Sequence, residues 1–232
     1  MKKQAFIYYL LTLVVLTACN NNTPEETTAI RTPAERLSQW VALEKKHIPL
    51  VQNGDVITRG GNDYISAGLR NFNDSDKAYS HAGIAFKEND TVFVYHIYVG
   101  DENPTGVMLR EPIDSFCYPS KLKGCGIFRY QLQGNELLQF QQTLKYFYAK
   151  KMVFDKQFNL SNDSTMYCAE LISKSLAIAT NNRLIIPTTT RKNVVMKDGI
   201  FGGQTAAKLT YIAPDNLYIN PFTKTVARFD YK

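Results

Sequence analysis

The sequence predicts an α+β domain in which an antiparallel sheet, or a small barrel, packs against helices. Two observations support this fold class: short apolar runs are separated by turn residues, and longer segments show the 3.6-residue periodicity of amphipathic helices. The chain has 232 residues, 44% of them hydrophobic and 21% charged, which is typical of a globular protein of ordinary domain size. No internal repeat or low-complexity segment interrupts this pattern.

The first helix is expected to begin after Thr32. Thr32, Pro33 and Glu35 form a capping-box pattern, with a hydroxyl N-cap, a proline at the first helical position and a glutamate three residues after the cap. The expected end is near residue 46, before the Ile48-Pro49 pair. The other helices are expected over residues 63–70, 135–150 and 165–180.

The strands are expected over residues 54–59, 80–86, 91–98, 107–109 and 126–130. Residues 87–90 are polar and predict a hairpin turn between the second and third of these strands. Such a turn would bring His81 and His96 alongside each other. Their spacing of 15 residues is odd, and a bulge changes the register of a hairpin, so whether the two side chains face each other stays open.

The N-terminus has the features of a lipoprotein signal peptide. Lys2 and Lys3 are followed by an apolar segment over residues 5–16, which is too short to span a bilayer comfortably. The segment Leu16–Cys19 resembles the bacterial lipobox, which implies that Cys19 is lipidated and anchors the chain to a membrane. An ordinary secretory signal with a chance cysteine is the alternative. The expected divisions are a signal peptide over 1–18, a flexible tether over 19–31 and a folded domain over 32–232.

The charge pattern bears on partners and location. The net charge is +6, and the Lys and Arg residues are spread along the chain in groups no denser than pairs. This dispersion favours a solvated surface and argues against nucleic-acid binding. The expected lipid anchor predicts a protein of the cell envelope, either periplasmic or surface-exposed. The sequence does not predict the oligomeric state.

Three cysteines remain once Cys19 is set aside. They are Cys117, Cys125 and Cys168, an odd number, so at least one thiol stays unpaired within the chain. Thiols can oxidise outside the cytoplasm. Cys117 and Cys125 could therefore close a small loop as a disulfide, or they could be two buried thiols.

Cys168 and His81 are the candidates for chemistry. Cys168 is expected in the first turn of a helix, where the helix dipole and unpaired N–H groups stabilise a thiolate. A nearby histidine can lower the thiol pKa further and later protonate a leaving group. His81 begins a strand of small and apolar residues, so its ring is expected near the edge of the core. A buried structural residue is the alternative for each, and His47, at a helix end, is expected to be structural.

Four segments carry a resemblance to a known family, and a fifth near the C-terminus, Ile212–Tyr218, agrees with it. The four are Gly54–Ile57, Ser80–Ile84, Phe154–Phe158 and Tyr167–Ile172. In this order they resemble the YiiX-type branch of the NlpC superfamily, whose members are circularly permuted papain-fold hydrolases related to lecithin retinol acyltransferase. In that branch the histidine strand precedes the cysteine helix, as it does here.

The resemblance implies roles for individual residues. Cys168 matches the nucleophile and His81 the general base, and His96 is expected as the third, orienting residue, as in the two-histidine site of the acyltransferase relatives. Tyr167, Glu170 and Asp155 are expected to contact substrate. The alternative for Glu170 is support of the first helical turn.

The expected function is that of a cell-envelope cysteine hydrolase that cleaves an amide, in a peptidoglycan peptide or another small peptide, through an acyl-enzyme. Two alternatives remain open: a thiol-dependent lipid acyl hydrolase or acyltransferase, and a non-catalytic binding lipoprotein with the same fold. No cofactor is expected. No metal site is expected either, since the histidines and cysteines form no ligand pair at zinc spacing and no glycine-rich phosphate loop occurs.

Overall fold

The computed structural model describes residues 32–195 and 205–231. The expected signal peptide and the tether with Cys19 lie outside the described residues. Within them, no helix is long and apolar enough to cross a membrane.

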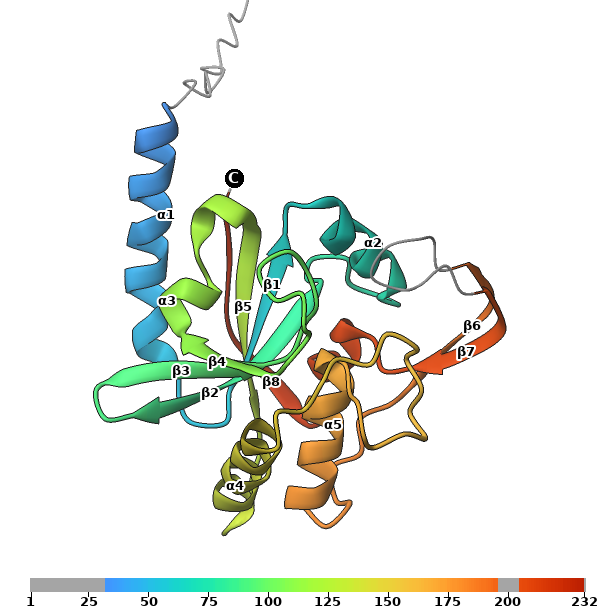
Figure 1. The fold of residues 1–232 in the computed structure, drawn as a ribbon. Helices are drawn as coiled ribbons and strands as arrows, with labels where there is room; N and C mark the ends of the chain where they lie inside the picture. Colours follow the sequence, from blue (N-terminus) through green and yellow to red (C-terminus); the bar gives the residue numbers. More distant parts are fainter. Residues whose placement is uncertain (1–31, 196–204, 232) are drawn as a thin grey trace, which may run out of the picture.

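A six-stranded antiparallel sheet forms the centre of the fold (Figure 1). Its strand order is β4-β3-β2-β1-β5-β8. All five pairs of neighbouring strands are antiparallel. The strands span β1 Val56–Gly61, β2 His81–Glu88, β3 Thr91–His96, β4 Leu109–Pro112, β5 Leu122–Tyr130 and β8 Thr223–Asp230. A separate hairpin pairs β6 Thr189–Val195 with β7 Thr205–Tyr211. This arrangement confirms the predicted class, an antiparallel sheet packed against helices.

The helices span α1 Pro33–His47, α2 Tyr64–Phe72, α3 Ile113–Phe116, α4 Glu136–Ala149 and α5 Cys168–Ala179, with short 3-10 turns at η1 Ile48–Leu50, η2 Pro119–Lys121 and η3 Pro214–Leu217. Four helices, α1, α2, α4 and α5, lie close to the predicted segments, whereas α3 and the 3-10 turns were not predicted. The capping box is formed: Thr32 Oγ1 accepts the N–H of Glu35 at 3.3 Å, and Oε2 of Glu35 accepts the N–H of Thr32 at 2.8 Å.

Helix α5 begins three residues later than predicted, at Cys168 itself. The preceding residues are held by other partners, because Thr165 bridges to Val153 and the N–H of Met166 donates to the carbonyl of Val153 at 3.0 Å. The same segment also explains why β4 lies at residues 109–112 and not at the predicted 107–109. Val107 bridges to Val153 and therefore does not join the sheet. A contact between distant segments therefore decides both boundaries.

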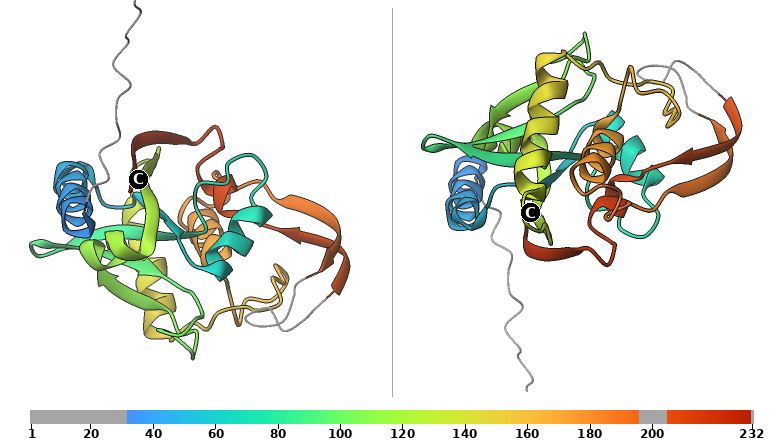
Figure 2. Two further views of the ribbon diagram at one scale, coloured as in Figure 1. Left: turned by 90° about the horizontal axis from the view of Figure 1, so that it is seen from above. Right: turned by 90° about the horizontal axis from the view of Figure 1, so that it is seen from below.

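Apolar side chains cover both faces of the sheet, in two clusters. On one face, residues from β1, β2, β3 and β5 meet α1 and α3, and this cluster includes Ile57, Ala85, Val94, Ile127 and Phe116. On the other face, the alternate residues of the same strands meet α4 and α5, and this cluster includes Val56, Ala82, Ile84, Phe128 and Leu171. Figure 2 shows α1 and α4 on opposite sides of the sheet. The sheet is therefore the middle of three layers.

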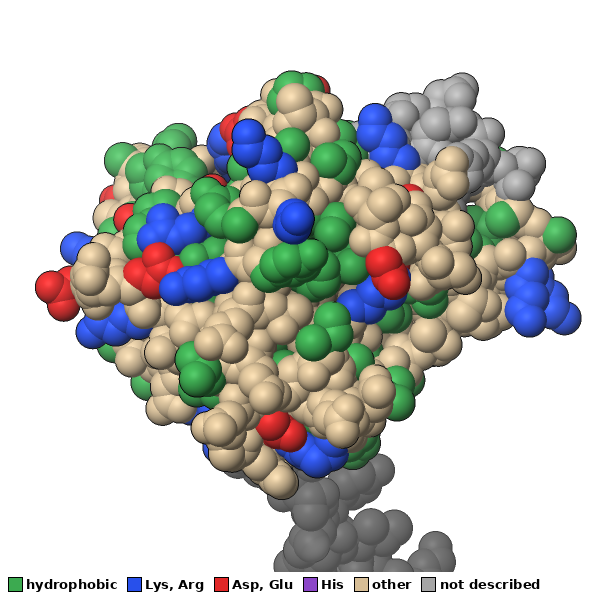
Figure 3. Space-filling model, turned by 60° about the horizontal axis from the view of Figure 1, so that its bottom comes forward, with side chains coloured by type: hydrophobic (Ala, Val, Ile, Leu, Met, Phe, Trp, Pro, Cys, Tyr) green, Lys and Arg blue, Asp and Glu red, His purple; other side chains and the backbone are tan. Residues whose placement is uncertain are grey.

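The surface carries charges of both signs. On the face drawn in Figure 3, Lys and Arg side chains lie in small groups beside acidic, polar and apolar ones. No continuous basic stripe crosses the described part of this face. That the protein does not bind nucleic acid stays a prediction.

Candidate active site

A row of four polar residues crosses four adjacent strands. Arg59 on β1 pairs with His81 on β2. The β2–β3 register sets Ile84 opposite Tyr95, which puts His96 opposite Gly83 and two residues from His81. Glu111 on β4 lies opposite Val94, again two residues away along β3 from His96. Because side chains alternate along a strand, all four project from the face that carries α1 and α3.

The two histidines and Glu111 are in direct contact. Nε2 of His81 lies 2.9 Å from Nδ1 of His96, and Nε2 of His96 lies 2.8 Å from Oε1 of Glu111. Gly83 makes room for this contact, since a Cβ there would lie 2.9 Å from the Cβ of His96 and 2.5 Å from Cγ1 of Val94. The predicted proximity of His81 and His96 is thus present, and Glu111 extends it by one residue that the sequence reasoning missed.

The charge of Glu111 determines which ring nitrogens of His96 and His81 carry protons. Burial alone would raise the pKa of Glu111, but contact with His96 and the charge of Arg59 more than offset burial, and the pKa falls below its usual range. The ionised carboxylate, 2.8 Å away, favours a proton on Nε2 of His96, although this contact does not have hydrogen-bond geometry. Nδ1 of His96 is then the acceptor, so Nε2 of His81 is the donor. Nδ1 of His81 is left unprotonated and can act as a base.

Aromatic rings and Arg59 surround the histidines. The ring centroid of Phe116 lies 5.6 Å from that of His81 and 5.0 Å from that of His96, and Tyr98 stacks on His96 at 5.6 Å. Arg59 donates to the carbonyl of Phe116 at 3.0 Å and lies 3.6 Å from Glu111. Burial, followed by the charge of Arg59, lowers the pKa of His81 well below its ordinary value. His81 is therefore neutral at neutral pH.

Cys168 approaches from the opposite layer of the fold. It opens helix α5, which packs on the other face of the sheet, and its thiol contacts the main chain of Ala82, the residue after His81. The pairing of β2 with β3 ends at Ile84, opposite Tyr95, so His81 and Ala82 lie beyond the paired part of β3. The nucleophile candidate thus contacts the residue that follows the base candidate.

The thiol of Cys168 is protonated in this environment. Burial raises its pKa to about 11, while main-chain N–H groups of Ala82, Ala169 and Cys168 and the charge of Arg59 act in the opposite direction. The expected effect of the helix N-terminus is present but smaller than the cost of burying a charge. Cys168 is therefore a neutral thiol at neutral pH, not the thiolate that helix placement alone predicted.

Cys168 and His81 line one pocket of about 500 Å³. Its other lining residues are mainly aromatic and aliphatic and come from α2, the segment after β3, the Phe154–Phe158 segment and the segment after β7; they include Phe72, Tyr98, Phe154, Phe158, Tyr211 and Ile212. We call this hollow the apolar pocket.

Of the three residues predicted to contact substrate, one lines this pocket. Tyr167 does so, and its hydroxyl accepts the N–H of Ile212 at 2.7 Å. Glu170 is buried and lies 2.8 Å from Nζ of Lys174, and burial raises its pKa to about 7. Asp155 accepts the N–H groups of Gln157 at 2.8 Å and Asn159 at 2.6 Å. These contacts brace the local chain, and substrate binding by Glu170 and Asp155 stays a prediction.

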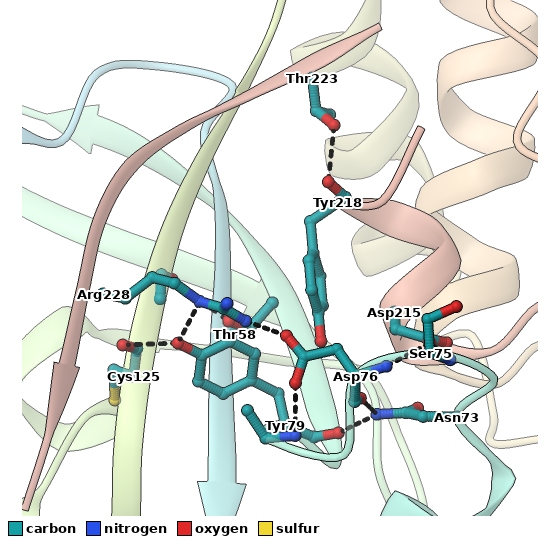
Figure 4. Close-up of polar contacts among 12 residues, drawn as sticks. Thr58, Asn73, Ser75, Asp76, Tyr79, Cys125, Asp215, Tyr218, Thr223 and Arg228 are labelled. Atoms are coloured by element: carbon teal, nitrogen blue, oxygen red, sulfur yellow. Dashed lines mark hydrogen bonds and ion pairs between the residues drawn. The ribbon is translucent and has the colours of Figure 1, made fainter. Parts of the chain in front are cut away.

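A second polar network holds the segment before His81 (Figure 4). Oδ2 of the buried Asp215 accepts three consecutive main-chain N–H groups, from Asp74, Ser75 and Asp76, at 2.9, 2.7 and 3.1 Å. Arg228 on β8 then pairs with Asp76. The C-terminal part of the chain therefore fixes the loop that leads into β2. Asp215 lies in the segment Ile212–Tyr218, which the sequence marked only by resemblance.

Cys117 and Cys125 are free thiols, and both are buried. Their side chains contact each other, and this contact, with burial, raises the pKa of Cys117 well above its ordinary value. Of the two possibilities left open by the sequence, the structure has two buried thiols. They lie in the cluster with α1 and α3 and do not line the apolar pocket.

No family model matches the chain, and a search of curated proteins finds no match. Among solved structures, the chain is similar to the metalloprotein YiiX from Escherichia coli O157:H7, which has a domain of unknown function. The similarity covers 77% of this chain and 97% of YiiX, with a TM-score of 0.58 and 19% sequence identity. The chain has a YiiX-like fold. At this identity the similarity concerns the fold alone.

Proposed function

We propose that the protein is a cell-envelope cysteine hydrolase with a circularly permuted papain-like fold of the NlpC type, anchored to a membrane through Cys19. Cys168 is its nucleophile and His81 its general base. The observation that carries this proposal is that both residues line one pocket, with the proton positions of His81 set by Glu111 through His96. The YiiX-like fold agrees with the family resemblance of the sequence from which this proposal starts.

The first half of the reaction forms a thioester. As the sulfur of Cys168 attacks the carbonyl carbon, its proton passes to Nδ1 of His81, because a neutral thiol needs a base at that moment. His81 then gives the proton to the leaving amine or alcohol, and the bond between the carbonyl carbon and the leaving group breaks. Glu111 stabilises the charge that develops on the paired rings.

The second half releases the acyl group. A water molecule gives a proton to His81 and attacks the thioester carbon, and the carbon–sulfur bond breaks as the sulfur regains a proton. The products are the free acid and the original thiol. The main-chain N–H groups of Ala82 and Ala169, which contact the sulfur at rest, are placed to stabilise the oxyanion of each tetrahedral intermediate.

A metal-dependent role does not fit the described residues. YiiX is a metalloprotein by its crystal structure. Within residues 32–195 and 205–231 of this chain, no group of three or more His, Cys, Asp or Glu side chains is arranged to hold a metal ion. Both ring nitrogens of His96 are already in contact with partners. We therefore derive no step through a metal.

Two substrate classes suit this chemistry. The amide of a small envelope peptide follows from the location, whereas a lipid acyl group is favoured by the aromatic and aliphatic lining of the apolar pocket. A non-catalytic binding protein would need the pocket but not the proton arrangement around His81.

Replacement of Cys168 by alanine tests the proposal. The wild-type protein should release product from labelled phospholipid or from muropeptides, and Cys168→Ala should abolish both this turnover and labelling of the Tyr167–Ile172 peptide by iodoacetamide. Cys117→Ala, which removes a buried thiol elsewhere, is the matched control and should retain both. Turnover that persists in Cys168→Ala would contradict the assignment.

A further inference from the structure

Two hollows meet over His81. One is the apolar pocket. The other is a groove of about 1120 Å³ lined by residues of β1, the start of α2, residues 98–102 and Lys121. The two hollows share six lining residues: Ile65, Leu69, Ser80, His81, Tyr98 and Val99. We call the second hollow the polar groove because charged residues line it, although most of its exposed lining surface is apolar.

The two hollows differ in charge. Among the described residues, no Lys, Arg, Asp or Glu lines the apolar pocket. Five line the polar groove: Arg59, Asp63, Asp101, Glu102 and Lys121. A charged substrate group would lose its hydration in the apolar pocket without gaining a charged partner, which is unfavourable. The groove offers hydrogen-bonding and ionic partners.

The catalytic residues are divided between the hollows in the same way. Cys168 lines the apolar pocket and does not line the groove, whereas His81 lines both. In the proposed reaction the sulfur bonds to the acyl carbon, so the acyl half of the substrate must extend from Cys168. The leaving group takes its proton from His81 and can depart on the groove side.

We propose that the substrate is an acyl ester or amide with an apolar acyl half, bound in the apolar pocket, and a polar leaving half, bound in the polar groove. This inference rests on the proposed function and names its substrate class. It disfavours peptides that carry a charged residue on the acyl side of the scissile bond. Phe72, which stacks on Phe158 at 6.4 Å and lines only the apolar pocket, is a determinant of acyl selectivity.

Alkyl methanethiosulfonates test the acyl side without any need for turnover. Cys168 attacks the sulfenyl sulfur, the S–S bond to the sulfonyl group breaks, methanesulfinate leaves with the thiol proton, and the alkylthio group remains on Cys168 as a mixed disulfide. Rates at Cys168, followed by peptide mass and divided by the rates with glutathione, should be at least tenfold higher for the butyl reagent than for the sulfonatoethyl and trimethylammonioethyl reagents.

A pocket variant and a matched control locate the preference. Phe72→Ala should lower the butyl preference at least threefold, because it removes one wall of the apolar pocket. Tyr146→Ala removes an aromatic ring that is 57% exposed on α4 and should keep the wild-type ratio. Melting temperatures check that both variants are folded. Equal normalised rates for the three reagents in the wild type would overturn the proposal.

Two esters with one carboxylate each test the orientation of the substrate. In 3-carboxy-4-nitrophenyl butyrate the charge is on the leaving half, and in mono-4-nitrophenyl adipate it is on the acyl half. After subtraction of the Cys168→Ala rate, kcat/KM should be at least tenfold higher for the first. The reverse order would overturn this inference and leave the thiol mechanism standing. If neither ester is hydrolysed in a Cys168-dependent manner, the proposed function fails, and the thiosulfonate rates still decide the pocket assignment.

Discussion

Nε2 of His81 lies 2.9 Å from Nδ1 of His96, and the other nitrogen of His96 faces the carboxylate of Glu111. This order makes Glu111 a positioning residue that acts through His96. Glu111→Gln removes the charge that holds the proton on Nε2 of His96, and the His81 base can then adopt the wrong tautomer. We expect kcat to fall about 10–100-fold, as for other residues that orient a functional histidine, with a KM close to that of the wild type.

The control for Glu111 is a neighbour on the same short strand. Arg110 projects from the opposite face of β4, opposite Tyr95, and pairs with Glu88. Arg110→Gln should leave kcat within about twofold of the wild-type value. A Glu111→Gln protein with full activity and an unchanged pH profile would show that the tautomer order does not depend on Glu111.

The pKa of Cys168 predicts an unusual pH dependence of alkylation. Burial raises this pKa to about 11, the charge of Arg59 acts in the opposite direction, and the titratable Tyr167 is also close to the thiol. The rate of iodoacetamide labelling should therefore rise about tenfold per pH unit from pH 7 to pH 10, because only the thiolate reacts. Glutathione, with an ordinary thiol, is the reference, and its rate should level off earlier. A plateau at neutral pH would instead indicate a thiolate–imidazolium pair.

Gly83 and Gly68 form a matched pair of glycines. A Cβ on Gly83 would lie 2.9 Å from the carbonyl oxygen of Tyr95 and from the Cβ of His96, so Gly83→Ala must separate β2 from β3 and displace His96. We expect both activity and stability to fall. Gly68, inside α2, has open space around it, so Gly68→Ala should stabilise the protein by about 0.5–1 kcal/mol in urea unfolding.

Asp215 predicts a stability effect at a distance from the pocket. Asp215→Ala leaves three main-chain N–H groups of the loop before β2 without their acceptor, and each such group costs about 1–3 kcal/mol when it stays buried. Because these groups are partly exposed, we expect a total loss of at least about 2 kcal/mol by urea unfolding. Asp90→Ala, in the exposed β2–β3 turn, should change stability by less than about 0.5 kcal/mol. Equal effects of the two substitutions would contradict the role given to Asp215.

Glu44 predicts how stability depends on pH. Burial raises its pKa to about 7, the hydroxyl of Tyr231 acts in the opposite direction, and the charge of Asp114 adds to the rise. The carboxyl group of Glu44 therefore binds its proton more tightly in the folded protein than in the unfolded chain. The contribution of this proton to the free energy of unfolding is fully present below pH 4.5 and is lost as the pH rises through 7. Glu44→Gln should melt close to the wild type at pH 4.5 and at a higher temperature at pH 8. A constant difference between the two proteins across this range would be inconsistent with the shift.

Local patterns in the sequence were sufficient for most elements of the fold. The capping box at Thr32 and the apolar alternation around His81 predict α1 and β2 within a residue or two. The start of α5 and the position of β4 could not be predicted in this way, since both depend on bridges to Val153 that form only in the folded chain.

The candidate residues of the site could be chosen from the sequence, but their pKa shifts could not. Cys168 and His81 were marked by position and by resemblance, whereas Arg59 and Glu111 are ordinary charged residues on their strands until the sheet register aligns them with His81. The raised pKa of Cys168 was missed for a physical reason. A helix N-terminus can be read from the sequence, but the depth of burial, which outweighs it here, depends on the whole fold.

The placement of Cys168 and His81 in different layers has a consequence for the immature protein. The thiol belongs to the layer of α5, and its base projects toward the layer of α1 and α3, so neither layer alone holds a competent site. If the proposed function holds, a partly folded chain carries an ordinary cysteine and no catalyst. The proposed hydrolytic activity would then serve as a sensor of complete folding, and it should disappear at the same denaturant concentration at which the three layers separate.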